Sequence, residues 1–219
     1  MTDSNPTDLA AMLCSRLCHD MLSPVGALSN GLELLAVETD PEMRKSVMEL
    51  LEQSATISTN KLKFFRLAFG AAGGFGDRVD VAEPRSLIEA LAGDNDKIQI
   101  NWAIETANLS KPSVKVLLNF AQIAIDALVR GGTLDVGAEV RDGNCEIVVR
   151  ATGPKIAFDE TIGKAIEGSL PSSELSSRTA AAHMIALLAE ESGGGLQYAR
   201  TDEALVLGAV LPEPEGLIG

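Results

Sequence analysis

The sequence is poor in the residues that usually point to metal sites, disulfides or membranes. Its 219 residues include only two histidines and three cysteines, and aromatic residues make up 4%. Cys14, Cys18 and Cys145 are too few, and odd in number, for a disulfide framework, so we expect a reducing, cytoplasmic location. No apolar run reaches the roughly 18 residues that a membrane-spanning helix needs. We therefore expect no membrane partner.

Positive charge is also scarce. The chain has 18 Lys and Arg against 31 Asp and Glu, a net charge of −13. A nucleic-acid binder must neutralise phosphates with clustered Lys and Arg, so we expect no nucleic-acid partner. The first residues, MTDSNPTDLA, are polar and acidic, unlike a signal peptide. With 46% apolar and 22% charged residues, the composition is that of a globular chain with a sizeable core.

Two long helices are predicted in residues 1–70. Apolar residues recur in steps of three and four from Asp8 to about Val37, and again from Pro41 to about Phe69. Thr7 or Asp8 is expected to cap the first helix, and Thr39-Asp40-Pro41 forms a turn that begins the second. A short turn makes the pair an antiparallel hairpin. A single hairpin cannot cover both apolar stripes, so we expect a homodimer in which two hairpins form a four-helix bundle.

The pattern changes after a glycine-rich stretch at residues 71–77, which we interpret as a linker. Residues 78–219 mix strand and helix patterns, which predicts an α/β sandwich with helices on one face of a mixed sheet. The expected strands are DRVDV, KIQINWAIE, TLDVGAEV, CEIVVRA, LQYAR and ALVLGAVL. The expected helices are PRSLIEAL, KPSVKVLLNFAQIAIDALVRGG and PSSELSSRTAAAHMIALLAEESGGG.

His19 stands out within the stretch CHDMLSPVG. At about 100° per residue its side chain lies roughly 200° from the core residue Leu17, so it faces solvent. Pro24, five positions later, removes a helical hydrogen bond and bends the helix close to His19. An exposed helical histidine can also be an ordinary surface residue. The same face carries Ser15, Arg16, Leu22, Ser23, Gly26 and Asn30.

The segment His19-Asp20-Met21-Leu22-Ser23-Pro24 resembles the H-box of sensor histidine kinases. There, the phospho-accepting histidine is followed by an acidic residue and, five positions on, by a proline. The hairpin is similar to the dimerisation and histidine phosphotransfer domain of these kinases. The remainder resembles their ATP-binding domain, so the resemblance covers nearly the whole chain.

The nucleotide motifs of that domain are not kept. The kinase Asp-x-Gly-x-Gly motif corresponds to the stretch ATGPK, with Ala151 in place of the aspartate and Lys155 in place of the second glycine. The later glycine box corresponds to residues 176–182, SSRTAAA, which contain no glycine. Asn119 or Asp126 takes the place of the Mg²⁺-binding asparagine without a clean match. We therefore expect no ATP binding, and no cofactor or metal of the chain's own.

The chain as a whole resembles the ChpT family of alphaproteobacterial histidine phosphotransferases. The segments that carry the resemblance are Arg16-Leu17-Cys18-His19-Asp20, Ser23-Pro24, Gly31-Leu32-x-Leu34-Leu35 and Arg66-x-Ala68-Phe69-Gly70-Ala71. This resemblance implies a phosphorelay. The receiver domain of a hybrid histidine kinase would donate a phosphoryl group to His19, and response regulators controlling the cell cycle would accept it. A non-catalytic receiver-binding adaptor or inhibitor, and an active histidine kinase, remain alternatives.

In this relay His19 is the expected phospho-accepting residue, because a histidine with its ordinary pKa of about 6.5 is largely neutral and nucleophilic at cell pH. We expect Asp20 to orient the imidazole through its other ring nitrogen; a solvated carboxylate is the alternative. Mg²⁺ would come from the partner receiver. The residues expected to bind partners are Arg16, Leu22, Ser23, Gly26, Asn30, Lys61 and Lys63.

The remaining candidates are weaker. The basic residues at the His19 end of the hairpin, which include Arg66, either meet the acidic pocket of a receiver or form a solvated helix end. His19 points about 100° away from Cys18 and about 140° away from Cys14 around the helix, which argues against a metal site. His183 has apolar neighbours and is expected to be a packed helix residue.

Overall fold

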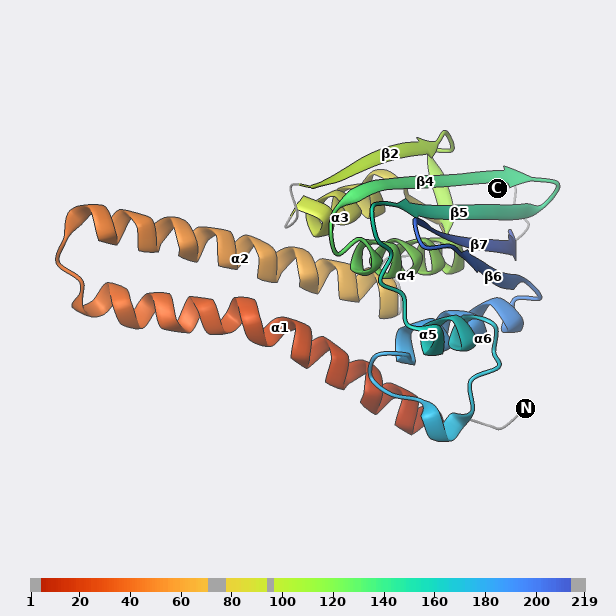
Figure 1. The fold of residues 1–219 in the computed structure, drawn as a ribbon, viewed down its shortest axis with the longest axis horizontal. Coiled ribbons are helices and arrows are strands. Elements are labelled where there is room, and N and C mark those ends of the chain that lie inside the picture. Colours follow the sequence, from red (N-terminus) through yellow and green to blue (C-terminus); the bar gives the residue numbers. More distant parts are fainter. Residues whose placement is uncertain (1–4, 71–77, 94–96, 214–219) are drawn as a thin grey trace.

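The computed structural model describes residues 5–70, 78–93 and 97–213, and it places a long helical hairpin beside an α+β domain (Figure 1). The hairpin consists of α1 (Pro6–Val37) and α2 (Pro41–Phe69), as predicted. Asp40 caps α2 by accepting from the amides of Glu42 and Met43. Asn5, rather than Thr7 or Asp8, caps α1, because its side chain accepts from the Thr7 amide. The predicted linker, residues 71–77, lies outside the described residues.

The second part is built on a five-stranded mixed sheet, ordered β2-β4-β5-β7-β6. β2 and β4 run parallel, and every other pair is antiparallel. A further two-stranded sheet joins β1 to β3. The strands are β1 (Arg78–Asp80), β2 (Ile98–Ile104), β3 (Asn108–Ser110), β4 (Gly132–Arg141), β5 (Asn144–Thr152), β6 (Gly195–Arg200) and β7 (Ala204–Pro212).

Three helices cover one face of the large sheet, as the sequence predicts: α3 (Ala82–Gly93), α4 (Lys111–Ala127) and α6 (Ala180–Glu191) (Figure 1). α4 is the central one and packs against β5 and β7. The strands alternate because successive side chains point to opposite faces. On β5, Cys145, Ile147, Val149 and Ala151 are fully buried under the helices, whereas Val148 is 49% exposed on the open face. Trp102, on β2, is half-buried beneath the guanidinium of Arg85, 5.6 Å from its ring centroid.

Some short elements were not predicted. They are β3, the helix α5 (Glu160–Ile166) and the 3₁₀ turn η1 (Ser172–Glu174). The last helix was predicted to start near Pro171 but begins only at Ala180. Just before it, the Thr179 hydroxyl accepts from the Ser176 amide. Such local side-chain bonds compete with helix formation.

The hairpin joins the α+β domain at one end only. Near its C-terminus α2 buries Phe64, Phe65, Leu67 and Ala68 in the main core, packing against α3 and α4, while α1 touches α6. Away from this junction the two helices touch closely at Gly31, where a Cβ atom would lie 2.8 Å from Leu51 Cδ2. No helix in the described part of the chain is long and apolar enough to cross a membrane.

The outer surface of the hairpin remains apolar. Large apolar side chains are exposed along both helices: Leu22, Val25, Leu32, Leu34, Val37, Met43, Met48, Leu50 and Leu62. Exposed apolar side chains that gather in a patch mark an interface. Leu32 belongs to the apolar stripe of the first helix, and Met43 and Leu50 belong to that of the second. These are the stripes that a second hairpin was predicted to cover. Within one chain, the hairpin does not cover them.

Candidate functional site

His19 lies on α1 where the hairpin meets the α+β domain. Its side chain is 85% exposed, as the helical spacing predicts. Nδ1 is 3.2 Å from Asp20 Oδ1. When Nδ1 carries the proton it donates to this carboxylate, and the lone pair is then on Nε2. The arrangement therefore offers an exposed imidazole with one nitrogen held and the other available as a nucleophile.

Pro24 affects this site through a backbone atom of Asp20. In a regular helix the amide of residue 24 would donate to the carbonyl of Asp20, but proline has no N–H. Lys61 of α2 supplies the missing donor, because its Nζ lies 3.2 Å from the Asp20 carbonyl oxygen. Lys61 is half-buried in this position. The helix interruption next to His19 is thus compensated by the neighbouring helix, and Lys61 contacts its own chain.

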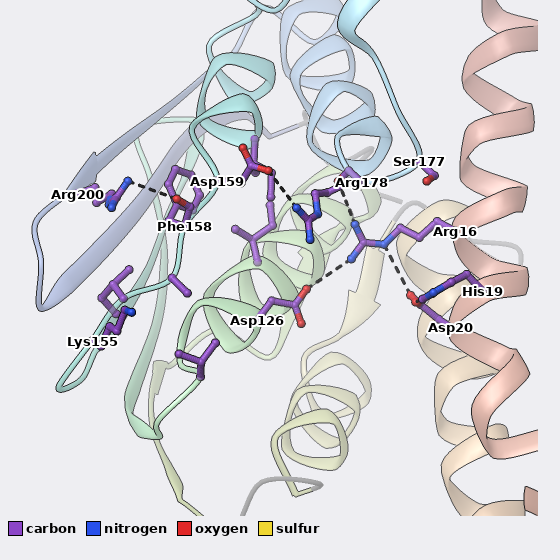
Figure 2. A pocket seen from close by; sticks show the side chains of 15 residues that line it. Arg16, His19, Asp20, Asp126, Lys155, Phe158, Asp159, Ser177, Arg178 and Arg200 are labelled. Carbon is purple, nitrogen blue, oxygen red and sulfur yellow. Dashed lines mark hydrogen bonds and ion pairs between the residues drawn. The ribbon is translucent and has the colours of Figure 1, made fainter.

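Arg16 also contacts its own chain (Figure 2). Its side chain is only 15% exposed, with Nε 3.7 Å from Asp20 Oδ2 and one terminal nitrogen 3.5 Å from Asp126 Oδ2. Its other terminal nitrogen donates to the carbonyl oxygen of Arg178 at 3.2 Å. The sequence predicted a solvent-facing charge on the partner face. The structure instead places Arg16 between α1, α4 and the segment before α6.

A cavity of about 940 Å³ opens beside His19, between α1 and the α+β domain (Figure 2). Its walls come from α1, α4, α5, the segment around Lys155 and the segment before α6. Besides His19, several charged side chains line it: Arg16, Asp20, Asp126, Lys155, Asp159, Arg178 and Arg200. The site is therefore a polar recess with the imidazole at its edge.

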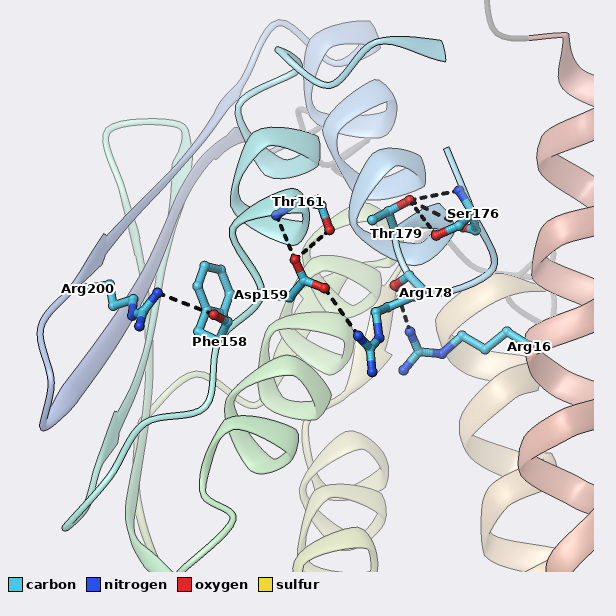
Figure 3. Close-up of polar contacts among 8 residues, drawn as sticks. All are labelled: Arg16, Phe158, Asp159, Thr161, Ser176, Arg178, Thr179 and Arg200. Atoms are coloured by element: carbon cyan, nitrogen blue, oxygen red, sulfur yellow. Dashed lines mark hydrogen bonds and ion pairs between the residues drawn. The ribbon is translucent and has the colours of Figure 1, made fainter. Parts of the chain in front are cut away.

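Hydrogen bonds order the far wall of this cavity (Figure 3). Asp159 caps α5 by accepting from the hydroxyl and amide of Thr161, at 2.7 and 2.9 Å. Arg178 donates to the other carboxylate oxygen at 3.2 Å. The Thr161 hydroxyl, then the Thr161 amide and Arg178, lower the pKa of Asp159 below its ordinary value. Because Arg16 is bonded to the Arg178 carbonyl, this wall is linked to α1.

The degenerate nucleotide motifs have structural roles here. Ala151 is fully buried on β5. Gly153 cannot carry a side chain, because a Cβ atom would lie 2.6 Å from the carbonyl oxygen of Gly131. Asn119 is 1% exposed and donates to the Lys115 carbonyl of its own helix. Of the two candidates for the asparagine position, only Asp126 lines the cavity.

The other predicted partner-binding residues are exposed, except Gly26, which is half-buried. Leu22 is 70% exposed, and Ser23, Asn30 and Lys63 are also exposed. Gly26 has no atom within 4 Å of the position that a Cβ would take. These residues form an accessible strip along α1 beyond His19, with Lys63 on α2.

Sequence reasoning did not place Asp126, Asp159 and Arg178 at the site. Asp126 was considered only as a relic of the asparagine position, Arg178 only as part of the degenerate glycine box, and Asp159 belongs to no motif. His183 is half-buried, as expected for a packed residue, and burial lowers its pKa. Cys14 and Cys18 are exposed. Over residues 5–70, 78–93 and 97–213, no three metal-ligating side chains of the His, Cys, Asp or Glu type converge.

Comparisons with known proteins agree on one family. Residues 81–204 match the family model of the histidine phosphotransferase C-terminal domain. Protein phosphotransferase ChpT of Brucella abortus (strain 2308) is 35% identical over 202 residues, which are 92% of this chain and 95% of that protein. A solved structure of a bacterial phosphotransferase superposes with a TM-score of 0.81 at 32% identity, and the match covers 95% of this chain and 98% of the other.

Proposed function

Because the chain belongs to the histidine phosphotransferase family, we propose that it carries phosphoryl groups on His19 within a phosphorelay. The observation that supports this most directly is the exposed imidazole with Asp20 on Nδ1. Neither feature requires a bound nucleotide. A phosphoryl donor can approach Nε2 from solvent.

The chemistry is a phosphoryl exchange between two side chains. A receiver domain carries its phosphoryl group on an aspartate, as an acyl phosphate. Nε2 of His19 attacks phosphorus, the N–P bond forms, and the P–O bond to the receiver aspartate breaks with its electron pair staying on that carboxylate. The phosphorylated ring keeps the proton on Nδ1 and is positively charged, and the Asp20 carboxylate stabilises this charge. The reverse sequence delivers the group to the next receiver.

We propose that the receiver docks on a strip of α1 beyond His19, formed by the exposed Leu22, Ser23 and Asn30 and the half-buried Gly26, with Lys63 of α2 beside it. Leu22 offers apolar contact, and the missing side chain at Gly26 permits a close approach. The partners in this proposal are the receiver domain of a hybrid histidine kinase and downstream response regulators. Both use the same surface, so they bind one at a time. Their own Mg²⁺ accompanies the acyl phosphate.

We propose further that the protein does not phosphorylate itself from ATP. Ala151 is apolar and fully buried where a kinase needs an adenine-binding aspartate. Residues 176–178 and the start of α6 contain no glycine to wrap a phosphate chain. In the cavity beside His19, the side chain of Arg16 contacts Asp126 and the carbonyl oxygen of Arg178 instead of being free to bind a nucleotide.

The exposed apolar side chains of the hairpin support a homodimer. Leu32 and Leu50 are 60% and 47% exposed, and they belong to the two apolar stripes of α1 and α2. Two hairpins that pack along these stripes would form a four-helix bundle and remove this surface from water.

One experiment tests the function. The full chain is incubated with radiolabelled ATP alone, and separately with a radiolabelled, phosphorylated receiver domain of a hybrid histidine kinase. Label taken from the receiver, and lost in His19→Ala, is the expected result. Label taken from ATP alone would identify a kinase. Receiver binding without any label on the chain would identify a non-catalytic adaptor.

Asp20→Ala tests the positioning role of Asp20. Transfer should slow without stopping, because the imidazole remains nucleophilic when its tautomer is no longer fixed. A variant that transfers at the rate of the unaltered protein would show that Asp20 has no positioning role.

A further inference from the structure

The contacts of Arg16 connect His19 to the α+β domain through a short chain of charges. Asp20 is the central member: Oδ1 faces His19 Nδ1 at 3.2 Å and Oδ2 faces Arg16 Nε at 3.7 Å. Arg16 is held in turn by Asp126 of α4 and by the carbonyl oxygen of Arg178. The guanidinium of Arg16 thus joins three parts of the fold: Asp20 of α1, Asp126 of α4 and the segment before α6.

Burial makes the Arg16–Asp20 pair different from an ordinary surface ion pair, whereas the Asp126 side chain that holds Arg16 from α4 is 62% exposed. The side chains of Arg16 and Asp20 are 15% and 25% exposed, and Arg16 Nε is buried without a hydrogen-bond partner. Charges that are removed from water interact more strongly and are screened less. By contrast, the pair formed by Arg85 and Glu89 on α3 has the same i,i+4 spacing but is about half exposed on both sides.

We propose that Arg16 is a positioning residue for the phosphoryl transfer, and that Asp126 of the α+β domain anchors it. This inference rests on the proposed function of His19. Arg16 holds the Asp20 carboxylate in place and keeps a positive charge beside it, so that Asp20 accepts a hydrogen bond from the Nδ1–H of His19 and Nε2 is left as the nucleophile. A domain without nucleotide motifs would then still contribute to the transfer.

The first measurement is the tautomer of His19, read from the NMR shifts of isotope-labelled ring nitrogens at mildly alkaline pH. The chain has only two histidines, so His183→Gln assigns the signals. In the unaltered protein we expect His19 to carry its proton on Nδ1. In Arg16→Gln and Asp126→Asn the population should move toward the form protonated at Nε2. A purely structural role of Arg16 would leave the tautomer unchanged, and that result would overturn the proposal.

The second measurement is the transfer rate from a radiolabelled, phosphorylated receiver domain. We expect Arg16→Gln to lower the rate constant of transfer by about tenfold, because small displacements of a reacting group have effects of at least this size. Asp126→Asn should act in the same direction and less strongly, and receiver affinity should not change. Arg85→Gln is the matched control and should transfer normally.

A charge exchange separates positioning from simple attachment of α1 to α4. The double variant Arg16→Asp with Asp126→Arg restores opposite charges between the two helices but places a second carboxylate beside Asp20. We expect it to transfer no faster than Arg16→Gln. Full recovery would mean that Arg16 only ties the two helices together. If His19→Ala still accepted the phosphoryl group, the proposed function of His19 would be wrong. The tautomer measurement is independent of that result, because it reports only whether Arg16 positions the His19 ring.

Discussion

The hairpin and the α+β domain bury their apolar residues in different ways. α4 is surrounded by the sheet and its neighbouring helices, and it buries eleven of its seventeen residues. α1 is almost twice as long, yet its buried residues are only Pro24 and Gly31. Most exposed large apolar side chains in the described part of the chain lie on the hairpin. The α+β domain therefore buries most of its apolar side chains within one chain, whereas the hairpin leaves many of its own exposed.

The largest expected effect is in the core of the α+β domain. Phe120 of α4 is fully buried, and Phe120→Ala should lower the free energy of unfolding by about 3–5 kcal/mol through lost burial and a cavity. Chemical denaturation followed at several protein concentrations measures this. The loss should not depend on concentration, because the core lies within one chain. A concentration-dependent loss would show that the domain also relies on association.

The next effect should appear on the hairpin. Leu50→Glu places a charge on the exposed apolar stripe of α2, and loss of a buried leucine costs about 1.5–3 kcal/mol. If the proposed homodimer forms through this stripe, the variant should be monomeric where the unaltered protein is dimeric, as followed by sedimentation or size exclusion. Val148→Glu is the matched control, because Val148 is equally exposed, at 49%, on the open face of the sheet. If both variants behaved alike, the contrast between the two regions would be wrong.

A smaller effect is expected where α1 and α2 meet near His19. Lys61→Met removes the donor that satisfies the Asp20 carbonyl, and an unpaired, partly buried carbonyl costs about 1 kcal/mol. Hydrogen exchange should show faster opening of α1 around Pro24, with little change in the α+β domain. The exposed Lys63 provides the control Lys63→Met, which should leave exchange unchanged.

The smallest effect concerns acid stability of the α+β domain. Burial lowers the pKa of His183, so the folded domain favours neutral histidine. As the pH falls below the ordinary value of about 6.5, the unfolded chain takes up the proton first, and stability decreases until the pH passes the lowered pKa. His183→Gln should remove this part of the pH dependence, as measured by thermal unfolding across that range. An unaltered profile would exclude His183 as its source.

Regular elements and their order were predictable because they depend on local periodicity. The helical period of apolar residues in the hairpin and the alternation of apolar and polar residues in β5 are visible in the sequence. So is the Asp142-Gly143 pair that forms the turn between β4 and β5. The exposure of His19 followed from the same helical geometry. The short elements β3 and α5 were not predicted, because a few residues do not establish a period.

The surroundings of His19 were less predictable because they are built by contacts between distant parts of the chain. Arg16 bonds to the carbonyl of Arg178, which lies 162 positions later in the sequence. Pro24 was recognised as a helix interruption, but the residue that compensates for it, Lys61, lies on the other helix. The sequence predicted the nucleophile, whereas its supporting contacts depend on how the two regions pack.

The position of Trp102 has a practical consequence. It is the only tryptophan of the chain, and it lies on β2 under Arg85. Indole fluorescence therefore reports on the sheet and not on the hairpin, whereas circular dichroism detects the long helices directly. Melting curves recorded with both signals from one sample would coincide if the two regions unfold together, and they would separate if the hairpin opens while the sheet remains folded.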